Sequence, residues 1–176
     1  MSESCSDPEQ SLPLTPKVVS LWYRPPELLL GSETYSFSID IWGAACVIAE
    51  FLFGVPIFNG KTEVETLEMI VDLLGPPTVL SWPQMSEMPL LNDGKQSEIK
   101  SIFDSKASRR KCTSSAFIDT FCDLSPSGIS LLRSLFRYDP NTRWTTKMAI
   151  SSNWFTEDPL PCNEADMPSF ANKRLP

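Results

Sequence analysis

Hydrophobic residues along the chain fall into several stretches of helical character, separated by breaks rich in proline and glycine. Residues 36–53 (SFSIDIWGAACVIAEFLF) form the most apolar stretch, and Asp40 and Glu50 are its only charged residues. Gly54 and Pro56 follow it in the order that is typical of a helix C-terminus. Because apolar side chains occur all round this helix, the pattern predicts burial on most of its sides, in a protein core or in lipid.

A membrane span is the less favoured of these two interpretations. Residues 41–58 would be just long enough to cross a bilayer. Glu50 would then lie near the middle of the span, at a cost of about 2.5–3.5 kcal/mol or more. Gly54 and Pro56 would also interrupt the final turn. The stretch therefore predicts a buried central helix, and no membrane partner is expected.

A second helix is predicted over residues 62–74 (TEVETLEMIVDLL). Thr62 and Glu65 have the spacing of a capping box, in which a hydroxyl and a carboxylate satisfy free amides at the helix N-terminus. The Gly-Pro-Pro run at 75–77 ends the pattern. The apolar stripe of this helix consists of Leu67, Ile70, Val71 and Leu74.

Proline steps delimit most of the other elements. The Ser-Pro step at 125–126 predicts a helix start, and the Asp-Pro step at 139–140 predicts its end. A short helix is predicted over 145–152. Residues 78–124 are rich in turn formers and are predicted to be irregular. Helices should therefore dominate, with strands nearly absent.

Two structures are possible for the segment 17–24 (KVVSLWYR). Its β-branched and aromatic residues fit either a short strand or an extended loop. The prolines at 25 and 26 forbid a helix that runs through them, although one could start at Glu27.

Charge and composition exclude several classes of function. The chain has 15 Lys plus Arg, 22 Asp plus Glu, no histidine and a net charge of −7. This acidic balance argues against a general nucleic-acid binder, and the lack of histidine excludes histidine-dependent nucleophiles, acid–base catalysts and metal sites. The seven glycines are too far apart for a phosphate-binding loop. The five cysteines contain no CxxC pair, which argues against a zinc site and favours a reducing compartment.

Several motifs, in a fixed order, resemble one protein family. The segment LTPKVVSLWYRPPELLLG (14–31) is similar to the end of a protein kinase activation segment, with PPE where APE is usual. SIDIW resembles the DxW motif of the helix that follows, and LLRSLFRYDPNTR resembles a motif near the end of the domain. The chain is identified as a member of the cyclin-dependent kinases, and its tail (DPLPCNEADMPSF) is similar to those of the PISSLRE and PITSLRE kinases.

This resemblance implies a mainly α fold: a partial protein-kinase-like C-terminal lobe, with the N-terminal lobe absent. We expect a disordered lead-in over 1–13, a partial kinase domain over 14–158 and an extended, proline-rich tail over 159–176. The sequence contains no glycine-rich loop, VAIK lysine, HRD loop or DFG motif. We therefore expect no catalytic or metal-binding residue, and neither ATP nor magnesium, the family's cofactors, on this chain.

The resemblance also assigns roles to the activation segment. Thr15 matches the activation-loop threonine, whose phosphorylation would add about −1.5 to −2 charges, although an unmodified flexible threonine stays equally open. Val18 and Val19 match the pocket that selects proline after the target Ser or Thr. Arg24 matches the arginine beside that pocket, and Ser20 stands where threonine is more usual and could contact a catalytic loop.

Other assigned roles are structural. Glu27 and Arg143, 116 positions apart, match a buried ion pair of the family, with two exposed surface charges as the alternative. Asp40 matches a residue that receives amides of the catalytic loop, and burial without that partner would be costly. Trp42 is interpreted as a core residue, as are Trp82 and Trp154. Without its usual helical neighbour, the helix at 36–53 is expected to expose an apolar patch.

The function inferred by resemblance is that of a fragment of a cyclin-dependent, proline-directed Ser/Thr kinase that is inactive alone. One alternative is an inert, pseudokinase-like module that binds substrates or docking subunits through 15–24 and 62–74. A small helical protein unrelated to kinases is the third possibility. The expected partners are a cyclin or docking subunit and protein substrates, without nucleic acid, in the nucleus or the cytoplasm.

Overall fold

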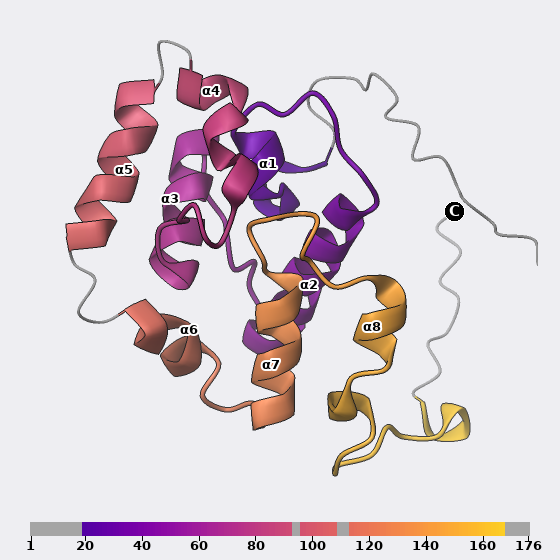
Figure 1. Ribbon diagram of the computed structural model, residues 1–176. Coiled ribbons are helices and arrows are strands. Elements are labelled where there is room, and N and C mark those ends of the chain that lie inside the picture. Colours follow the sequence, from indigo (N-terminus) through magenta and orange to yellow (C-terminus); the bar gives the residue numbers. More distant parts are fainter. Residues whose placement is uncertain (1–18, 93–95, 109–112, 168–176) are drawn as a thin grey trace, which may run out of the picture.

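Helix α2 (Ser38–Phe53) lies beside α7 (Pro126–Leu135) near the middle of the molecule (Figure 1). The structure is a computed structural model that describes residues 19–92, 96–108 and 113–167. Helix α2 ends where the sequence predicts, because Gly54 adopts the left-handed conformation (φ 72°) and its N–H donates to the Glu50 carbonyl at 2.7 Å. Glycine takes this conformation without a Cβ clash, so it terminates the helix.

Only one side of α2 is buried. Trp42, Ala45, Cys46 and Ala49 pack in the core. The prediction of burial on most sides is therefore wrong, and the exposed patch expected from the resemblance is present. The hydropathy pattern reports how apolar a face is, but not whether a neighbour covers it. The large exposed apolar residues of this helix and its ends are Phe37, Val47, Phe51, Leu52, Phe53 and Val55.

A bilayer-crossing helix is not found in the part of the chain that the structure describes, because no helix there combines the required length and hydropathy.

Side-chain caps fix the starts of three helices. In α3 (Glu63–Leu74), the Thr62 hydroxyl accepts from the Glu65 N–H at 3.1 Å, while the Glu65 carboxylate accepts from the N–H of Lys61 rather than from that of Thr62. Ser125 caps α7 through the Gly128 N–H at 3.1 Å. Thr145 caps the short helix α8 (Thr146–Ile150) in the same way. Each cap satisfies an amide that has no partner within its helix.

Helix α7 ends earlier than predicted. Its last residue is Leu135, and the Phe136 N–H donates back to the Leu132 carbonyl at 2.8 Å. Asp139, predicted to end the helix, instead organises the following turn, where its carboxylate accepts from the Asn141 N–H at 2.9 Å. The aspartate competes for backbone amides outside the helix, so the chain turns before the proline is reached.

The prediction that residues 78–124 are irregular is wrong. The described part of this stretch contains η2 (Pro83–Glu87), α4 (Pro89–Asn92), α5 (Gln96–Ser108) and α6 (Thr113–Thr120). Ile99 and Phe117 are each 3 % exposed and place α5 and α6 against the core, and both helices contact α3. Helices α5 and α6 are mostly polar, so a few tertiary contacts stabilise them rather than a long apolar stripe.

The ends of the described chain are also more helical than expected. Neither a strand nor an extended loop spans residues 19–24, because η1 (Leu21–Tyr23) is a 3-10 helix and is followed directly by α1 (Pro26–Leu29). Near the C-terminus, η3 (Asn153–Phe155) precedes η4 (Glu164–Asp166), which lies in the tail predicted to be extended. The described residues contain no strand.

Aromatic side chains form the centre of the core. Trp42 is fully buried, stacks on Phe58 at 5.9 Å between ring centroids and meets the edge of Phe136 at 5.0 Å. Trp82 stacks on Tyr138, whose hydroxyl donates to the Gly75 carbonyl at 2.7 Å. Burial raises the pKa of the Tyr138 phenol, so it remains a neutral donor. These contacts join the end of α3 to the segment after α7.

Candidate functional site

The segment from Val19 to Arg24 contains the most unusual backbone conformation in the described residues. Val19 has a φ of 71°, in the left-handed region that β-branched residues rarely adopt. Its carbonyl accepts a hydrogen bond of 3.0 Å from Arg24 Nη2. Such a conformation costs about 1–3 kcal/mol and persists only where its surroundings hold it. Arg24 supplies part of that restraint.

Arg24 is itself fixed by helix α3. Its Nη1 donates to Glu63 Oε1 at 2.7 Å, and its side chain is only 11 % exposed. Glu63 is the first residue of α3, a position where the helix dipole favours a carboxylate. Arg24 Nε is buried, and none of the residues that the structure describes accepts a hydrogen bond from it. The guanidinium thus bridges the Val19 carbonyl and the start of α3.

Two further hydrogen bonds anchor the same segment. Trp22 Nε1 donates to the Gly60 carbonyl at 3.1 Å, and the Tyr23 hydroxyl donates to Glu50 Oε2 at 2.7 Å. The bond to Glu50 raises the pKa of the Tyr23 phenol above its ordinary value, since the carboxylate favours the protonated phenol. The segment is therefore attached to α2 and to the loop before α3.

This geometry has a direct chemical consequence. This hydrogen bond from Arg24 holds the Val19 carbonyl and takes one of its two acceptor positions, which makes the carbonyl a poorer acceptor for the N–H of a peptide bound beside it. An ordinary residue placed there would lose a hydrogen bond of its backbone N–H, whereas proline has no N–H to leave unsatisfied. The arrangement can therefore favour proline in a bound chain.

Glu27 and Arg143 lie together and are almost completely buried, each 4 % exposed. Arg143 Nη1 and Nη2 donate to the two Glu27 carboxylate oxygens at 2.8 and 2.9 Å, which is the bidentate arrangement. All five guanidinium N–H groups are thus engaged. The other acceptors are the carbonyls of Arg137, Ser38 and Tyr138.

Four more of the predicted site residues are Thr15, Val18, Ser20 and Asp40. Thr15 and Val18 lie outside the described residues. Ser20 is exposed, and no hydrogen bond of its hydroxyl occurs among the residues that the structure describes. Asp40 is exposed in the first turn of α2, and its carboxylate has no partner there. The charge of Asp40 is therefore solvated and is favoured by the helix N-terminus. The expected cost of burying this carboxylate without a partner does not arise.

Two carboxylates of the site were not identified from the sequence. Glu63 and Glu65 both lie in the first turn of α3, and no local pattern indicates which one meets Arg24. In the sequence, Glu50 is one of only two charged residues in an apolar stretch. A carboxylate in such surroundings often has a specific partner, because burial without one is costly. The partner of Glu50, Tyr23, is 27 positions away.

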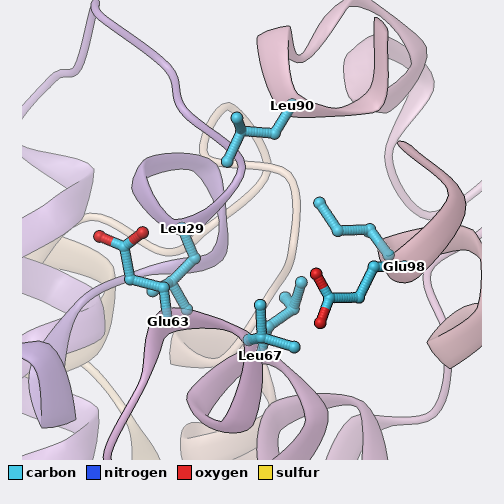
Figure 2. A pocket seen from close by; sticks show the side chains of 7 residues that line it. Leu29, Glu63, Leu67, Leu90 and Glu98 are labelled. Atoms are coloured by element: carbon cyan, nitrogen blue, oxygen red, sulfur yellow. The ribbon is translucent and has the colours of Figure 1, made fainter. Parts of the chain in front are cut away.

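Side chains that could bind a metal are not clustered in the described residues. They contain no group of three or more His, Cys, Asp or Glu that could hold a metal ion. A shallow hollow among α1, α3, α4 and α5 is lined mainly by leucine, isoleucine and valine (Figure 2), which suits aliphatic groups rather than phosphates. Burial raises the pKa of the Cys46 thiol, which disfavours the nucleophilic thiolate.

Comparison with known families and proteins gives a consistent match. The model of the protein kinase domain matches residues 2–155. The human protein "Cyclin-dependent kinase 10" is 41 % identical over 162 residues, which are 92 % of this chain and 41 % of the human one. "Cyclin-dependent kinase C-2" of Oryza sativa subsp. japonica is 37 % identical over 157 residues, 89 % of this chain and 28 % of its own. The chain thus spans about two fifths or less of the length of these relatives.

Solved structures agree with this match. The yeast RNA polymerase II CTD kinase CTDK-1 complex contains a chain that is 31 % identical, with a TM-score of 0.70 over 87 % of this chain and 47 % of that one. The CAK complex of Chaetomium thermophilum bound to ATP-gamma-S contains one that is 29 % identical, with a TM-score of 0.73 over 96 % of this chain and 49 % of that one. The helical fold described above corresponds to about half of each.

Proposed function

The chain belongs to the protein kinase family, and from this premise we propose that it forms the part of a cyclin-dependent Ser/Thr kinase that recognises Ser-Pro and Thr-Pro sites. Its similarity to cyclin-dependent kinases supports the class of enzyme. Recognition of the residue after the target Ser or Thr is assigned to the segment that carries Val18 and Val19, with Arg24 beside it. Ser20 is the candidate contact to a catalytic loop.

The observation that carries this proposal is the restrained carbonyl of Val19. A backbone N–H placed against it would lose a hydrogen-bond partner at a cost of about 1–3 kcal/mol, which corresponds to roughly fivefold or more in affinity. Proline avoids this cost. Hydrogen bonds from Arg24 to the Val19 carbonyl and to Glu63 fix the position of that carbonyl. The preference for proline should therefore depend on the Arg24 side chain, which a substitution can remove.

Replacing Arg24 with alanine should therefore reduce the preference for proline. Two fluorescent peptides that differ only by Ser-Pro and Ser-Ala would be titrated with the purified chain, and anisotropy would give both dissociation constants. The wild-type chain should bind the Ser-Pro peptide about fivefold or more tightly than the Ser-Ala peptide, and Arg24→Ala should bring the ratio close to one.

The matched control for this experiment is Arg137→Ala. Arg137 is an exposed arginine outside the segment, and its guanidinium donates to the Thr142 carbonyl. This variant should keep the wild-type ratio. Equal affinity of the wild-type chain for both peptides would contradict proline recognition, and an unchanged ratio in Arg24→Ala would contradict the role of Arg24.

We further propose that the chain alone transfers no phosphate. Phosphoryl transfer in kinases requires a lysine on the phosphates, acidic and amide ligands for magnesium, and a base that orients the hydroxyl. None of the motifs that supply these groups occurs in the 176-residue sequence. The purified chain, given ATP, magnesium and the Ser-Pro peptide, should leave the peptide unmodified by mass spectrometry, and a phosphopeptide would contradict this proposal.

The expected partners follow from the same assignment. A complete kinase of this type would bind a cyclin or another docking subunit and would use ATP and magnesium on its remaining segments. Thr15 is the proposed phosphorylation site of the activation segment. We place the protein in the nucleus or the cytoplasm, with protein substrates.

A second candidate function is an inert module that captures substrates or docking subunits. The hydrogen bonds that attach residues 22–24 to α2, α3 and the loop before α3 favour it, because they would present this segment to a partner without any catalytic group. The two functions differ in one measurement. Peptide binding without transfer, when the chain is supplied with the complementary N-terminal part of a related kinase, would favour the inert module, whereas transfer under those conditions would favour the kinase part.

A further inference from the structure

The shallow hollow of Figure 2 lies where four helices meet, and its floor is aliphatic. Leu29 comes from α1, Leu67 from α3 and Ile99 from α5, and they are only 2, 2 and 3 % exposed. Leu90 of α4 and Val64 of α3 are half-buried at the rim. The empty space of about 300 Å³ includes the part open to solvent, so a slender side chain would lie along this surface rather than inside an enclosed cavity.

Two glutamates border the hollow, and they differ in orientation. In Figure 2 the Glu98 carboxylate is turned toward the other lining side chains, whereas the Glu63 carboxylate is turned away from them. Glu63 is already bound to Arg24 at 2.7 Å. Across residues 19–92, 96–108 and 113–167, no hydrogen bond or ion pair engages the Glu98 carboxylate.

An aliphatic floor beside an exposed carboxylate has a specific chemical complement. A purely aliphatic ligand would contact the apolar floor but would offer no cation to the Glu98 carboxylate. A small cation would pair with Glu98 but would make no apolar contact with the floor. A lysine side chain satisfies both, because its four methylene groups lie on apolar surface while its ammonium reaches a polar edge. The net charge of −7 also attracts cationic segments to the chain.

We propose that this hollow is a docking site for a lysine side chain presented by a segment of a partner protein. The lysine stem would lie over Leu67 and Leu90, with its ammonium against Glu98. This site is distinct from the segment of residues 19–24 that is proposed to select proline, since the hollow is connected to Val19 only through Glu63 and Arg24. It therefore adds a second point of contact to any protein that the chain binds.

The charge dependence of this site can be tested with two small probes. n-Butylammonium reproduces the lysine side chain from Cβ to Nζ, and n-butanol is its neutral counterpart. Each would be titrated into the full chain while the methyl resonances of Val64, Leu67 and Leu90 are followed by NMR at constant ionic strength. Butylammonium should bind about two- to fivefold more tightly than butanol, as for an exposed ion pair.

Substitution of one carboxylate separates the proposed site from general cation binding. Glu98→Gln should remove the difference between the probes, while Glu33→Gln, a change at an exposed glutamate outside the hollow, should preserve it. A blocked alanine peptide with a single lysine should compete with butylammonium, and its norleucine analogue should not. Equal binding of both probes to the wild-type chain, an unchanged difference in Glu98→Gln, or failure of the lysine peptide to compete would each overturn the proposal.

Discussion

Replacing Arg143 with alanine should lower the free energy of unfolding of the chain by about 3–5 kcal/mol. The substitution leaves the Glu27 carboxylate buried without its cation. It also releases three backbone carbonyls, from Arg137, Ser38 and Tyr138. A cation–π contact disappears as well, because the guanidinium carbon lies 5.2 Å from the centre of the Trp42 ring.

Urea denaturation followed by circular dichroism would measure this loss, with Arg137→Ala as the control. Arg137 is exposed and its side chain makes one hydrogen bond, to the Thr142 carbonyl, so its removal should change stability by less than about 1 kcal/mol. Arg143→Lys keeps the charge but loses the planar fork, and it should fall between the two. A loss below about 1 kcal/mol in Arg143→Ala would show that the pair behaves like surface charges.

Gly60→Ala should destabilise the chain through a steric clash at the start of α3. A Cβ at this buried position would lie 2.4 Å from Thr66 Oγ1 and 2.6 Å from the Thr66 backbone nitrogen, so the start of α3 would have to shift. Overpacking of this kind costs about 1–3 kcal/mol. The Gly60 carbonyl also accepts from Trp22, so the substitution should disturb the segment from Val19 to Arg24.

Gly43→Ala is the matched control for this substitution. Gly43 lies within α2, and a Cβ there would meet nothing within 4 Å. Alanine at an unobstructed helical position should therefore raise stability by about 0.5–1 kcal/mol. Thermal melts of both variants would show midpoints that move in opposite directions. A lowered midpoint in Gly43→Ala would mean that α2 has a neighbour at that position in solution.

Local features of the fold could be predicted from the sequence because their causes are local. Thr62 and Ser125 begin helices and Gly54 ends one, since a hydroxyl or a missing Cβ acts within a few residues. Helices α5 and α6 could not be predicted in this way. Their stability depends on contacts with α3, and the sequence pattern contains no information about that neighbour.

In the candidate site, too, some residues could be assigned from the sequence and others depend on distant contacts. Val19 and Arg24 were assigned by resemblance, and the structure joins them through a hydrogen bond of 3.0 Å. Glu63, which fixes Arg24, is 39 positions further along the chain and has no distinguishing local pattern. Glu98 was not identified either, because an exposed glutamate becomes informative only when the aliphatic surface beside it is known.

The distance in sequence between Glu27 and Arg143 has a consequence for how the chain is made on the ribosome. The 116 positions that separate them must be synthesised before the two can meet. Leu131 and Leu132, which complete the core beside α2, also emerge late. Until then the core of the nascent chain is incomplete and the apolar side of α2 that later packs against α7 is exposed. Exposed apolar surface of this kind is bound by chaperones. Translation rate and chaperone supply should therefore govern the yield of native protein.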